Sequence, residues 1–467
     1  MFSSRVFILF ICVFSGVPRL SYASGPAIHP TDATFAVPVK IETFGKAWEG
    51  DLAFGLWEFN TTGSPVWGPT YPPTHSYLVV MKTNGELLRL RETNVDQSYW
   101  PVKYIPNDTL MFEGEPDTTT HFWNLKTNET TNFPNVYGHH DMVYNPFTDT
   151  FLTLRSDVRD IDGKSVLVDQ IVELDVSGNI LWSWDAYLDG HFDLSDACQC
   201  NETSVVNGTS VIDLTHANSV QWDFTDNIVY FNMRHLDTFC KIDKTTSKMI
   251  WCLGKHGTLT LLDSNGQKVS SLFFHSHDVQ EVQPDVFSMF DNDYDNTTNA
   301  TNPCPPTYEA TNGHSRMIEV SVNEQNMTAW VSWSWTAPRQ DWTPYWGSID
   351  RLPNGDRIGA FGSQSHYLPG SNITSPLPDS TGAVIVEVNQ TGQVVRTYTF
   401  PYGWGIYRVE EIPLDIGSSF ATPTSELTQS NLPESLSIFN TNIIEVAATV
   451  ITVIAVTYLI IARKRKK

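Results

Sequence analysis

Basic residues are scarce in this chain. It carries 29 Lys and Arg against 52 Asp and Glu over 467 residues, which gives a formal net charge of −23. Five of the basic residues stand together at the C-terminal end, so residues 24–442 are more acidic still. Such a surface repels nucleic acid and anionic lipid. We therefore expect no nucleic-acid partner, and a small anionic substrate would need a local positive pocket.

Cysteine is also sparse, with six residues in the chain. Cys12 lies in the N-terminal apolar run, which leaves an odd number elsewhere, so at least one thiol is unpaired or bonds another chain. Cys240 and Cys252 stand opposite each other on adjacent predicted strands, a register that permits a cross-strand disulfide. The pair Cys198 and Cys200 supplies too few ligands for a zinc site. We expect neither a metal nor a cofactor.

Long apolar runs lie at the two ends of the chain. Residues 1–23 have an early arginine, an apolar run and a small-x-small motif, the pattern of a secretory signal peptide. Residues 443–462 are long enough to span a bilayer, and the basic tail 463–467 favours a cytoplasmic end. A buried C-terminal helix is the alternative. The pattern predicts a single-pass type I protein of the plasma membrane or secretory pathway, with an extracellular or lumenal ectodomain.

The proposed ectodomain is rich in N-x-S/T sequons, which lie outside both apolar ends. They stand at Asn60, Asn107, Asn128, Asn201, Asn207, Asn296, Asn299, Asn326, Asn372 and Asn389. Together with a signal peptide, this density predicts N-linked glycans. Residues 414–442 are rich in Ser, Thr, Pro and Asn, which is typical of a stalk.

The segment 213–254 organises our interpretation of the fold. It contains four β-type runs, 217–223, 227–234, 238–243 and 248–254, separated by short turn signals. Aromatic and β-branched residues at this spacing favour a four-stranded antiparallel meander, the unit of a β-propeller. Other groups of runs repeat this layout between residues 51 and 400.

Six such groups predict an all-β, six-bladed propeller over residues 24–413. The group near 51–92 has three runs, so a C-terminal strand at 405–413 is expected to complete it and close the ring. The polar insertions 186–212, 255–274, 294–314 and 364–382 are expected to be rim loops. Two β-sandwiches are the structural alternative.

Three predicted blades begin with histidine. His140, His216 and His277 stand at what we take to be equivalent strand starts, which ring one mouth of a propeller channel. Arg316 begins another strand of the fifth group. A strand-start histidine often only bonds a nearby loop. Together, however, these residues would form a cationic cluster suited to a planar or tetrahedral oxyanion.

The ordered motifs resemble the arylsulfate sulfotransferase family of six-bladed propellers, including its eukaryotic membrane-anchored relatives. They cover roughly residues 75–412 and consist of HHDMVYNP, ILWSWD, THANSVQWD, the run 234–253, HSHD with FDND, HSRMIEV and GSIDRLPNGD. The resemblance implies nucleotide-independent transfer of a sulfuryl group from a phenolic sulfate to a phenolic acceptor, through a sulfated histidine. By motif, His216 and His277 match two family histidines and Arg316 matches the family arginine. These residues would bind the sulfate oxygens and stabilise developing charge, with one histidine relaying the phenolic proton.

One position departs from the family pattern. The nucleophilic histidine of the family is expected near 346–348, where this chain has Trp-Gly-Ser. His366 follows about 20 residues later and would have to fold back to the channel. Otherwise His140 or His216 would be the nucleophile. A fold without the transfer activity is a further reading.

Two functions of different classes therefore remain. One is an aryl sulfotransferase, supported by the histidines and the family layout. The other is a catalytically inactive extracellular propeller that binds a glycan or protein, supported by the missing histidine, the sequons and the stalk. A quinone-dependent dehydrogenase is weaker, because the repeated tryptophans fit blade packing.

Overall fold

The structure is a computed structural model that describes residues 35–59, 73–92, 98–115, 118–196, 203–206, 208–293, 314–362 and 381–412. All of them belong to one compact unit of the chain. Strands dominate the described residues, which also include the short 3-10 helices η1 (Arg234–Leu236) and η3 (Arg339–Asp341).

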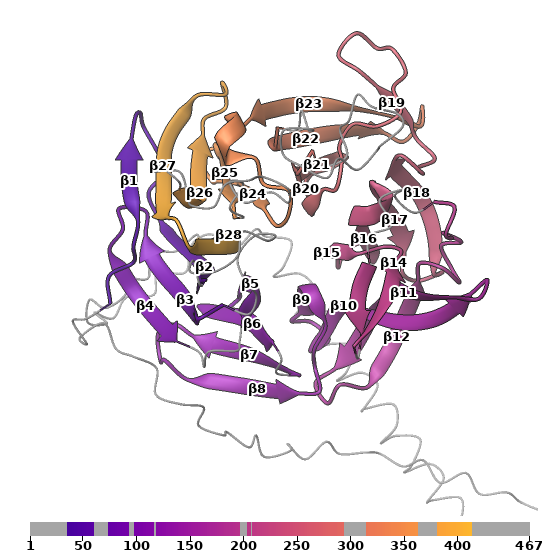
Figure 1. The fold of residues 1–467 in the computed structure, drawn as a ribbon, viewed down its shortest axis with the longest axis horizontal. Helices are drawn as coiled ribbons and strands as arrows, with labels where there is room; N and C mark the ends of the chain where they lie inside the picture. The colour runs from indigo at the N-terminus through magenta and orange to yellow at the C-terminus, as the bar shows by residue number, and fades with distance from the viewer. Residues whose placement is uncertain are drawn as a thin grey trace, which may run out of the picture. The chain divides into compact units, whose positions relative to one another are not determined.

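The strands form six sheets arranged as blades around a central axis (Figure 1). From the axis outward, blade 1 contains β28 (Trp404–Ile412), β2 (Asp51–Glu58), β3 (His75–Lys82) and β4 (Leu87–Glu92), and blade 2 contains β5 (Ser98–Ile105), β6 (Thr109–Glu115), β7 (Thr119–Asn124) and β8 (Thr130–Pro134). Blade 3 contains β9 (His139–Asn145), β10 (Thr150–Ile161), β11 (Lys164–Asp175) and β12 (Ile180–Asp185), and blade 4 contains β15 (Ala217–Asp223), β16 (Ile228–Met233), β17 (Thr238–Asp243) and β18 (Lys248–Gly254). Blade 5 contains β20 (His277–Gln283), β21 (Val286–Asp291), β22 (Arg316–Asn323) and β23 (Thr328–Thr336), and blade 6 contains β24 (Ser348–Arg351), β25 (Arg357–Phe361), β26 (Thr381–Val388) and β27 (Val394–Pro401).

The predicted closure of the ring is confirmed. The C-terminal strand β28 pairs antiparallel with β2, with Phe54 opposite Val409, and becomes the innermost strand of blade 1. The inner strands β28, β5, β9, β15, β20 and β24 contact one another in sequence and back to the start. The six-bladed propeller prediction is therefore correct, and the alternative of two β-sandwiches is excluded.

The hydrophobic core is divided among the blade interfaces. Each of six buried clusters joins two neighbouring blades. For example, Phe239 of blade 4 packs beside Phe287 of blade 5, with ring centroids 5.2 Å apart. Because the apolar faces of blades are buried against each other, no blade can bury its own surface alone.

Side-chain oxygens near the axis bind successive blades together. Asp141 accepts a hydrogen bond from the backbone N–H of Val220 in the next blade, and Asp278 accepts one from Ile349. Ser219 and Ser348 do the same for Val279 and Val409. These four contacts define one common register position on the inner strands of blades 3 to 6.

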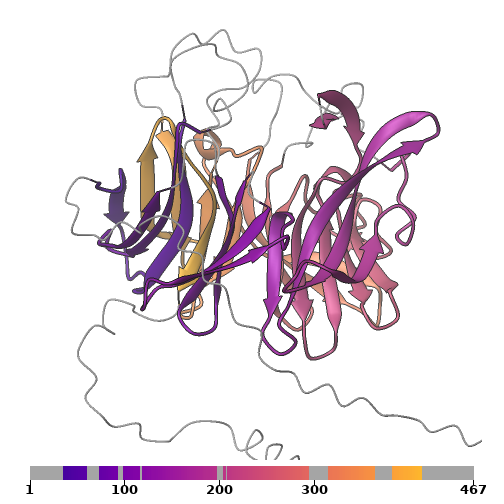
Figure 2. The same ribbon diagram turned by 90° about the horizontal axis from the view of Figure 1, so that it is seen from below.

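Two insertions that we expected to be loops contain strands. Within 186–212, β13 (Thr203–Val206) and β14 (Thr209–Asp213) form a hairpin that adds to β11, and within 255–274, β19 (Thr260–Leu262) pairs parallel with β23. The strand β1 (Lys40–Thr43) also extends blade 6. The sequences of these added strands gave no clear strand pattern, because an edge strand can be held by backbone hydrogen bonds without an apolar face of its own. The β10–β11 hairpin is also longer than expected and extends beyond the other blades (Figure 2).

The predicted disulfide is present between Cys240 and Cys252, which are opposite each other on β17 and β18. The predicted signal peptide 1–23, stalk 414–442, membrane segment 443–462 and tail 463–467 lie outside the described residues. Among the residues that are described, there is no helix with the length and hydrophobicity needed to span a bilayer.

Candidate active site at the propeller axis

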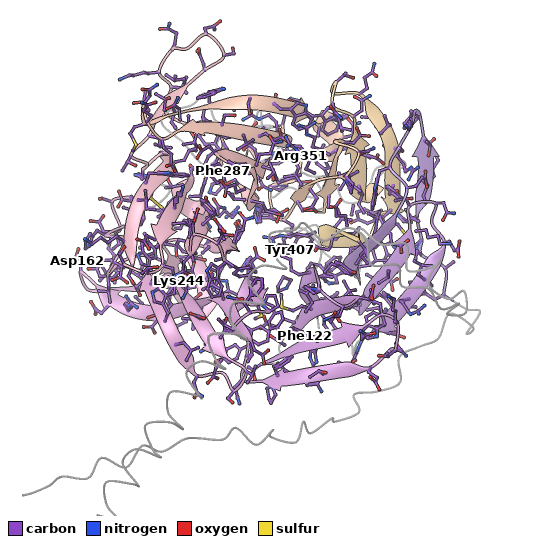
Figure 3. All side chains as sticks on the ribbon, turned by 180° about the vertical axis from the view of Figure 1, so that it is seen from behind. Phe122, Asp162, Lys244, Phe287, Arg351 and Tyr407 are labelled. Carbon is purple, nitrogen blue, oxygen red and sulfur yellow. A yellow bond between two sulfur atoms is a disulfide. The ribbon has the colours of Figure 1, made fainter. Side chains whose placement is uncertain are left out.

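The residues that immediately precede the common register position lie together around one end of the axis. His140 precedes Asp141, His277 precedes Asp278, and Gly347 precedes Ser348. On blade 1 the register position is Arg408 of β28, and the residue that precedes it is Tyr407. Tyr407 lies near the centre of the ring (Figure 3). Histidine, glycine and tyrosine from different blades thus share one layer of the propeller.

The three predicted histidines come together in this layer. The rings of His140 and His216 have centroids 5.1 Å apart, and Tyr407 lies 6.1 Å from His140 and 6.3 Å from His277. The expectation that the three stand at equivalent strand positions is wrong for His216, because Asn218 occupies that position in blade 4. His216 lies two residues earlier and reaches the cluster from the segment that enters β15.

Unusual backbone geometry turns two of these histidines toward the axis. His140 has φ +61° and His216 has φ +43°, both in the left-handed region that non-glycine residues rarely occupy. Such a residue stores strain of about 1–3 kcal/mol, which is retained where the surroundings hold it in place. For His216 the surroundings are Asp169, whose Oδ2 accepts hydrogen bonds from the Thr215 hydroxyl and the Ala217 N–H on either side.

Asp213 fixes the tautomer of His216. The carboxylate Oδ2 lies 2.7 Å from His216 Nδ1, so that nitrogen carries the proton and donates it. Burial alone would raise the pKa of Asp213, but the charge and hydrogen bond of His216 outweigh it and lower that pKa well below the usual range. The His216 side chain is 31% exposed, so part of its ring is accessible to a ligand.

Asn292 fixes His277 in the same way. The Asn292 amide nitrogen donates to the carbonyls of Thr343 and Trp346, which directs its oxygen toward His277 Nδ1 at 2.6 Å. His277 therefore donates from Nδ1. Burial lowers the pKa of His277 well below its usual value, and the nearby Arg234 lowers it further. His277 is a neutral imidazole at physiological pH.

His140 is held by a second histidine. Its Nδ1 atom lies 2.9 Å from Nδ1 of His139, so one of the two nitrogens donates to the other. Burial lowers the pKa of His140 well below its usual value, and neighbouring His139, His216, His277 and Arg408 act in the same direction. His140 and His277 are thus neutral imidazoles, and the charges around them favour negative charge in a ligand.

Two buried arginines supply that positive environment. Arg408 lies beneath Tyr407, with its guanidinium 3.1 Å from Asp141 and 3.2 Å from Asp278. Arg234, at the start of η1, is buried to 2% exposure and lies over the ring of Tyr345 at 5.5 Å. Both guanidiniums depress the pKa of His277, which places them within electrostatic reach of the histidines.

Arg316 begins a strand of blade 5, as predicted, and its guanidinium is hydrogen-bonded within that blade. It begins β22, the third strand from the axis in blade 5, and its Nε donates to Asp291 at 2.8 Å. A second guanidinium nitrogen donates to the carbonyl of Leu272. These contacts commit much of its hydrogen-bonding capacity within blade 5. The predicted site residue His366 lies outside the described residues.

Blade 6 contributes no imidazole at the register position, for a steric reason. Gly347 has φ +120°, and a Cβ atom placed on it would lie 2.4 Å from the ring of Phe290. A histidine there would meet both a backbone and a packing conflict. The preceding Trp346 instead packs against Trp57 and Phe59, which join Tyr407 in one aromatic cluster.

Asp213, His216 and His235 are close enough to suggest a metal site by residue type. However, Nδ1 of His216 points at the carboxylate of Asp213, and Nδ1 of His235 donates to the Asp213 carbonyl at 2.8 Å. The rings of His216 and His235 are stacked with their centroids 4.6 Å apart, so the lone pairs in the two ring planes point in nearly parallel directions. Ligands for zinc must instead converge on one point. We interpret the group as a hydrogen-bonded support for His216.

Sequence reasoning missed several members of the site. They are His139, Asp213, Asn218, Arg234, Asn292, Tyr407 and Arg408. A signal existed for some: His139 adjoins His140, Asn292 lies in the FDND motif, and Arg234 begins a family motif. Tyr407 and Arg408 lie on the closing strand, where no local pattern marks them.

Comparison with known proteins gives a family and little else. A sequence profile of the arylsulfotransferase (ASST) family matches residues 125–408. No curated protein sequence matches the chain. Among solved structures, a protein of unknown function from Bacteroides caccae is 10% identical, with 77% of this chain and 99% of that chain covered and a TM-score of 0.38. Virginiamycin B lyase from Staphylococcus aureus is 7% identical, with coverage of 78% and 88% and a TM-score of 0.32. The profile match spans more than half of the sequence, and on that ground the chain belongs to the arylsulfotransferase family.

Proposed function

We propose that this protein transfers a sulfuryl group from a phenolic sulfate to a phenolic acceptor, without a nucleotide donor, at the cluster of His140, His216 and His277. The observation that carries the proposal is the convergence of three imidazoles from consecutive blades, each held through Nδ1. Family membership supports the same reaction class. The buried guanidiniums of Arg234 and Arg408 support an anionic substrate.

His216 is the nucleophile in this proposal. Its Nδ1 proton is held by Asp213, which leaves the lone pair on Nε2 to attack the sulfur atom. As the new N–S bond forms, the bond between sulfur and the phenolic oxygen breaks, and a phenoxide leaves. The sulfated ring then carries positive charge, which the Asp213 carboxylate balances. This arrangement replaces the histidine that blade 6 lacks.

Neighbouring groups stabilise the charge that moves during transfer. Arg234 and Arg408 lower the electrostatic free energy of the sulfuryl oxygens and of the leaving phenoxide. A bound sulfate also raises the pKa of His140 and His277, because a nearby anion favours the protonated imidazole. In the second half-reaction, the acceptor oxygen attacks sulfur, its proton passes to a neutral imidazole, and the N–S electron pair returns to His216.

The test is a pre-steady-state experiment on the full-length protein. Mixed with a chromogenic aryl sulfate and no acceptor, it should release about one phenolate per chain and yield a peptide with sulfated His216 by mass spectrometry. His216→Ala should abolish the burst and keep the melting temperature, while the matched control His75→Ala, on the outer part of blade 1, should keep both. Sulfation of His140 or His366 instead would reassign the nucleophile, and the absence of any burst would refute the transfer reaction.

A binding module without turnover is the second candidate, and one observation favours it. Gly347 and Phe290 leave blade 6 without the histidine that the family pattern supplies. Such a module would recognise a glycan or protein through its rim, as in our second sequence-based hypothesis. It predicts saturable binding of that ligand with no phenolate burst, and His216→Ala would then affect neither property.

Membrane anchoring and glycosylation remain part of the proposal. Residues 443–462 would cross the membrane once, and the propeller would face the lumen or the cell exterior. In support, Asn107 and Asn326 are exposed in turns between adjacent strands, where a glycan meets no packed side chain. Enzymatic deglycosylation should increase gel mobility, and Asn107→Gln should remove one step of that shift. Full sensitivity of the propeller to cytosolic protease in sealed vesicles would contradict the topology.

A further inference from the structure

We propose that His139 and Asp169 form a proton relay behind His140, which lets a neutral phenol act as the sulfuryl acceptor. The inference rests on the proposed sulfuryl transfer and adds two positioning residues to it. Neither residue touches the substrate in this scheme. Each acts through His140.

The relay is a continuous chain of contacts within blade 3. His140 Nδ1 lies 2.9 Å from His139 Nδ1, and His139 Nε2 lies 3.2 Å from the Asp169 carboxylate. The Ser156 hydroxyl lies 2.8 Å from His139 Nε2 and donates to Asp169 Oδ1. Ser156 therefore accepts from His139, which fixes a proton on His139 Nε2. The chain leads from the accessible cluster to a carboxylate that is 2% exposed.

The charges along the chain favour movement of a proton away from the cluster. His140 is surrounded by His139, His216, His277 and Arg408, all of which oppose a positive charge on its ring. Burial raises the pKa of Asp169 and Asp213 acts in the same direction, yet His139 and Ser156 bring that pKa below its usual value. Asp169 is thus an anion that stabilises a cationic His139. A proton received by His140 is better held one residue farther back.

The step balances as follows. The acceptor phenol gives its proton to His140 Nε2 while its oxygen forms the bond to sulfur. The His140 Nδ1 proton moves to His139 Nδ1, so His140 returns to neutrality and His139 becomes the cation paired with Asp169. The N–S bond of sulfated His216 breaks, and its electron pair returns to Nε2. His140 then loses its Nε2 proton to solvent as the Nδ1 proton returns to it from His139, which restores the starting tautomers of both rings.

The relay is needed only when the acceptor must lose a proton, and this separates it from a structural role. With full-length protein and 4-methylumbelliferyl sulfate as donor, we would compare His139→Gln with wild type using two acceptors. One is N-acetyltyrosinamide, whose phenol has a pKa of about 10, and the other is a nitrophenol that is ionised at the assay pH. Asp169 is left intact, because its Oδ2 accepts from the Thr215 hydroxyl and the Ala217 N–H on either side of His216.

We expect His139→Gln to slow transfer to the tyrosine derivative by about 100-fold, the size of a general-base contribution. Transfer to the ionised nitrophenol and the first-half burst should change by less than about threefold. The variant should also gain a rate that rises with pH as the phenol ionises, whereas His75→Gln should behave as wild type. Equal losses with both acceptors would overturn the relay while leaving the sulfuryl transfer intact. A wild type that forms no sulfated histidine would overturn both.

Discussion

His216 donates a hydrogen bond from Nδ1 to the buried carboxylate of Asp213 over 2.7 Å. The same carboxylate accepts from the His216 backbone N–H, so ring and backbone are fixed by one residue. Asp213 is the last residue of β14 in the added hairpin of blade 3, and the Ser204 hydroxyl of β13 donates to its Oδ2. The orientation of the proposed nucleophile therefore depends on a strand that lies outside the basic four-stranded blade.

Asp213→Asn tests that dependence. An amide can donate to His216 Nδ1 and thereby favour the wrong tautomer, which moves the proton to Nε2 and removes the nucleophilic lone pair. We expect the phenolate burst rate to fall by about 100-fold or more. Asp263→Asn, at an exposed turn carboxylate, should leave the rate unchanged. A burst rate for Asp213→Asn within a few-fold of wild type would contradict the assignment of His216.

Gly347→Ala should destabilise the propeller through steric conflict as well as through backbone strain. Its φ of +120° disfavours any side chain, and the added Cβ would lie 2.4 Å from the Phe290 ring. We expect a loss of about 2–4 kcal/mol in the free energy of unfolding, measured with urea. Gly163→Ala is the matched control, because it also has positive φ but has no atom within 4 Å of the added Cβ. Equal losses in the two variants would mean that Phe290 yields easily.

Arg408→Met should cost much of the stability of the fold. Arg408 pairs with Asp141 and Asp278, which are each 2% exposed and which also bind neighbouring blades. Removing the guanidinium leaves two buried carboxylates beside each other, a change that costs about 3–5 kcal/mol. Chemical denaturation is the measurement, with Lys40→Met as control, because Lys40 is exposed and pairs with the exposed Glu42. Lys103 Nζ also lies 3.5 Å from Asp141, and a loss below about 1 kcal/mol would show that this lysine alone neutralises the pair.

Glu410 should contribute a loss of stability as pH rises from about 4.5 to about 7, while the lowered pKa values of His140 and His277 act in the opposite direction below pH 6.5. Burial raises the pKa of Glu410 on β28 to about 7, whereas the unfolded value is 4.5. Within that window the folded state holds a proton that the unfolded state has lost, so each increase in pH favours unfolding. Glu387 adds to the trend, since burial raises its pKa to about 7 as well.

Glu410→Gln isolates the contribution of that residue. The amide cannot ionise and can still accept from the Tyr104 N–H, so the variant should lose less stability than wild type between pH 5 and pH 7.5. Melting temperatures across that range provide the measurement, with the exposed Glu86→Gln as control. Parallel pH profiles for Glu410→Gln and wild type would disprove the linkage.

Much of the fold was readable from the sequence because a propeller repeats a local pattern. Strand spacing, turn residues and the three-run first group predicted six blades and the closing strand. The pairing of Cys240 with Cys252 followed from the hairpin register. The added strands β13, β14 and β19 were not readable, because their pairing depends on which blade edge lies nearby in three dimensions.

The site was readable in part for the same reason. Strand starts predicted that His140, His216 and His277 would meet, yet the bulge between Ala217 and Ser219 shifts the register of blade 4 and displaces His216. The position of Arg316 depends on Asp291 across a strand pair, and sequence distance does not encode that ion pair. Arg234 begins a motif that the sequence showed, but its position beside Tyr345 and near His277 depends on the fold and not on the motif.

Because β28 pairs with β2, the side chains at the axis are complete only after the C-terminal strand has joined blade 1. This strand supplies both the last ladder of blade 1 and the side chains of Tyr407 and Arg408 at the axis. During synthesis from the N-terminus, five blades and most of the first emerge before residue 404. Until then the carboxylates of Asp141 and Asp278 lack their arginine, and the histidines lack the ring beside them. A nascent or truncated chain without this strand therefore lacks the complete set of side chains at the axis, which only the closed ring brings together.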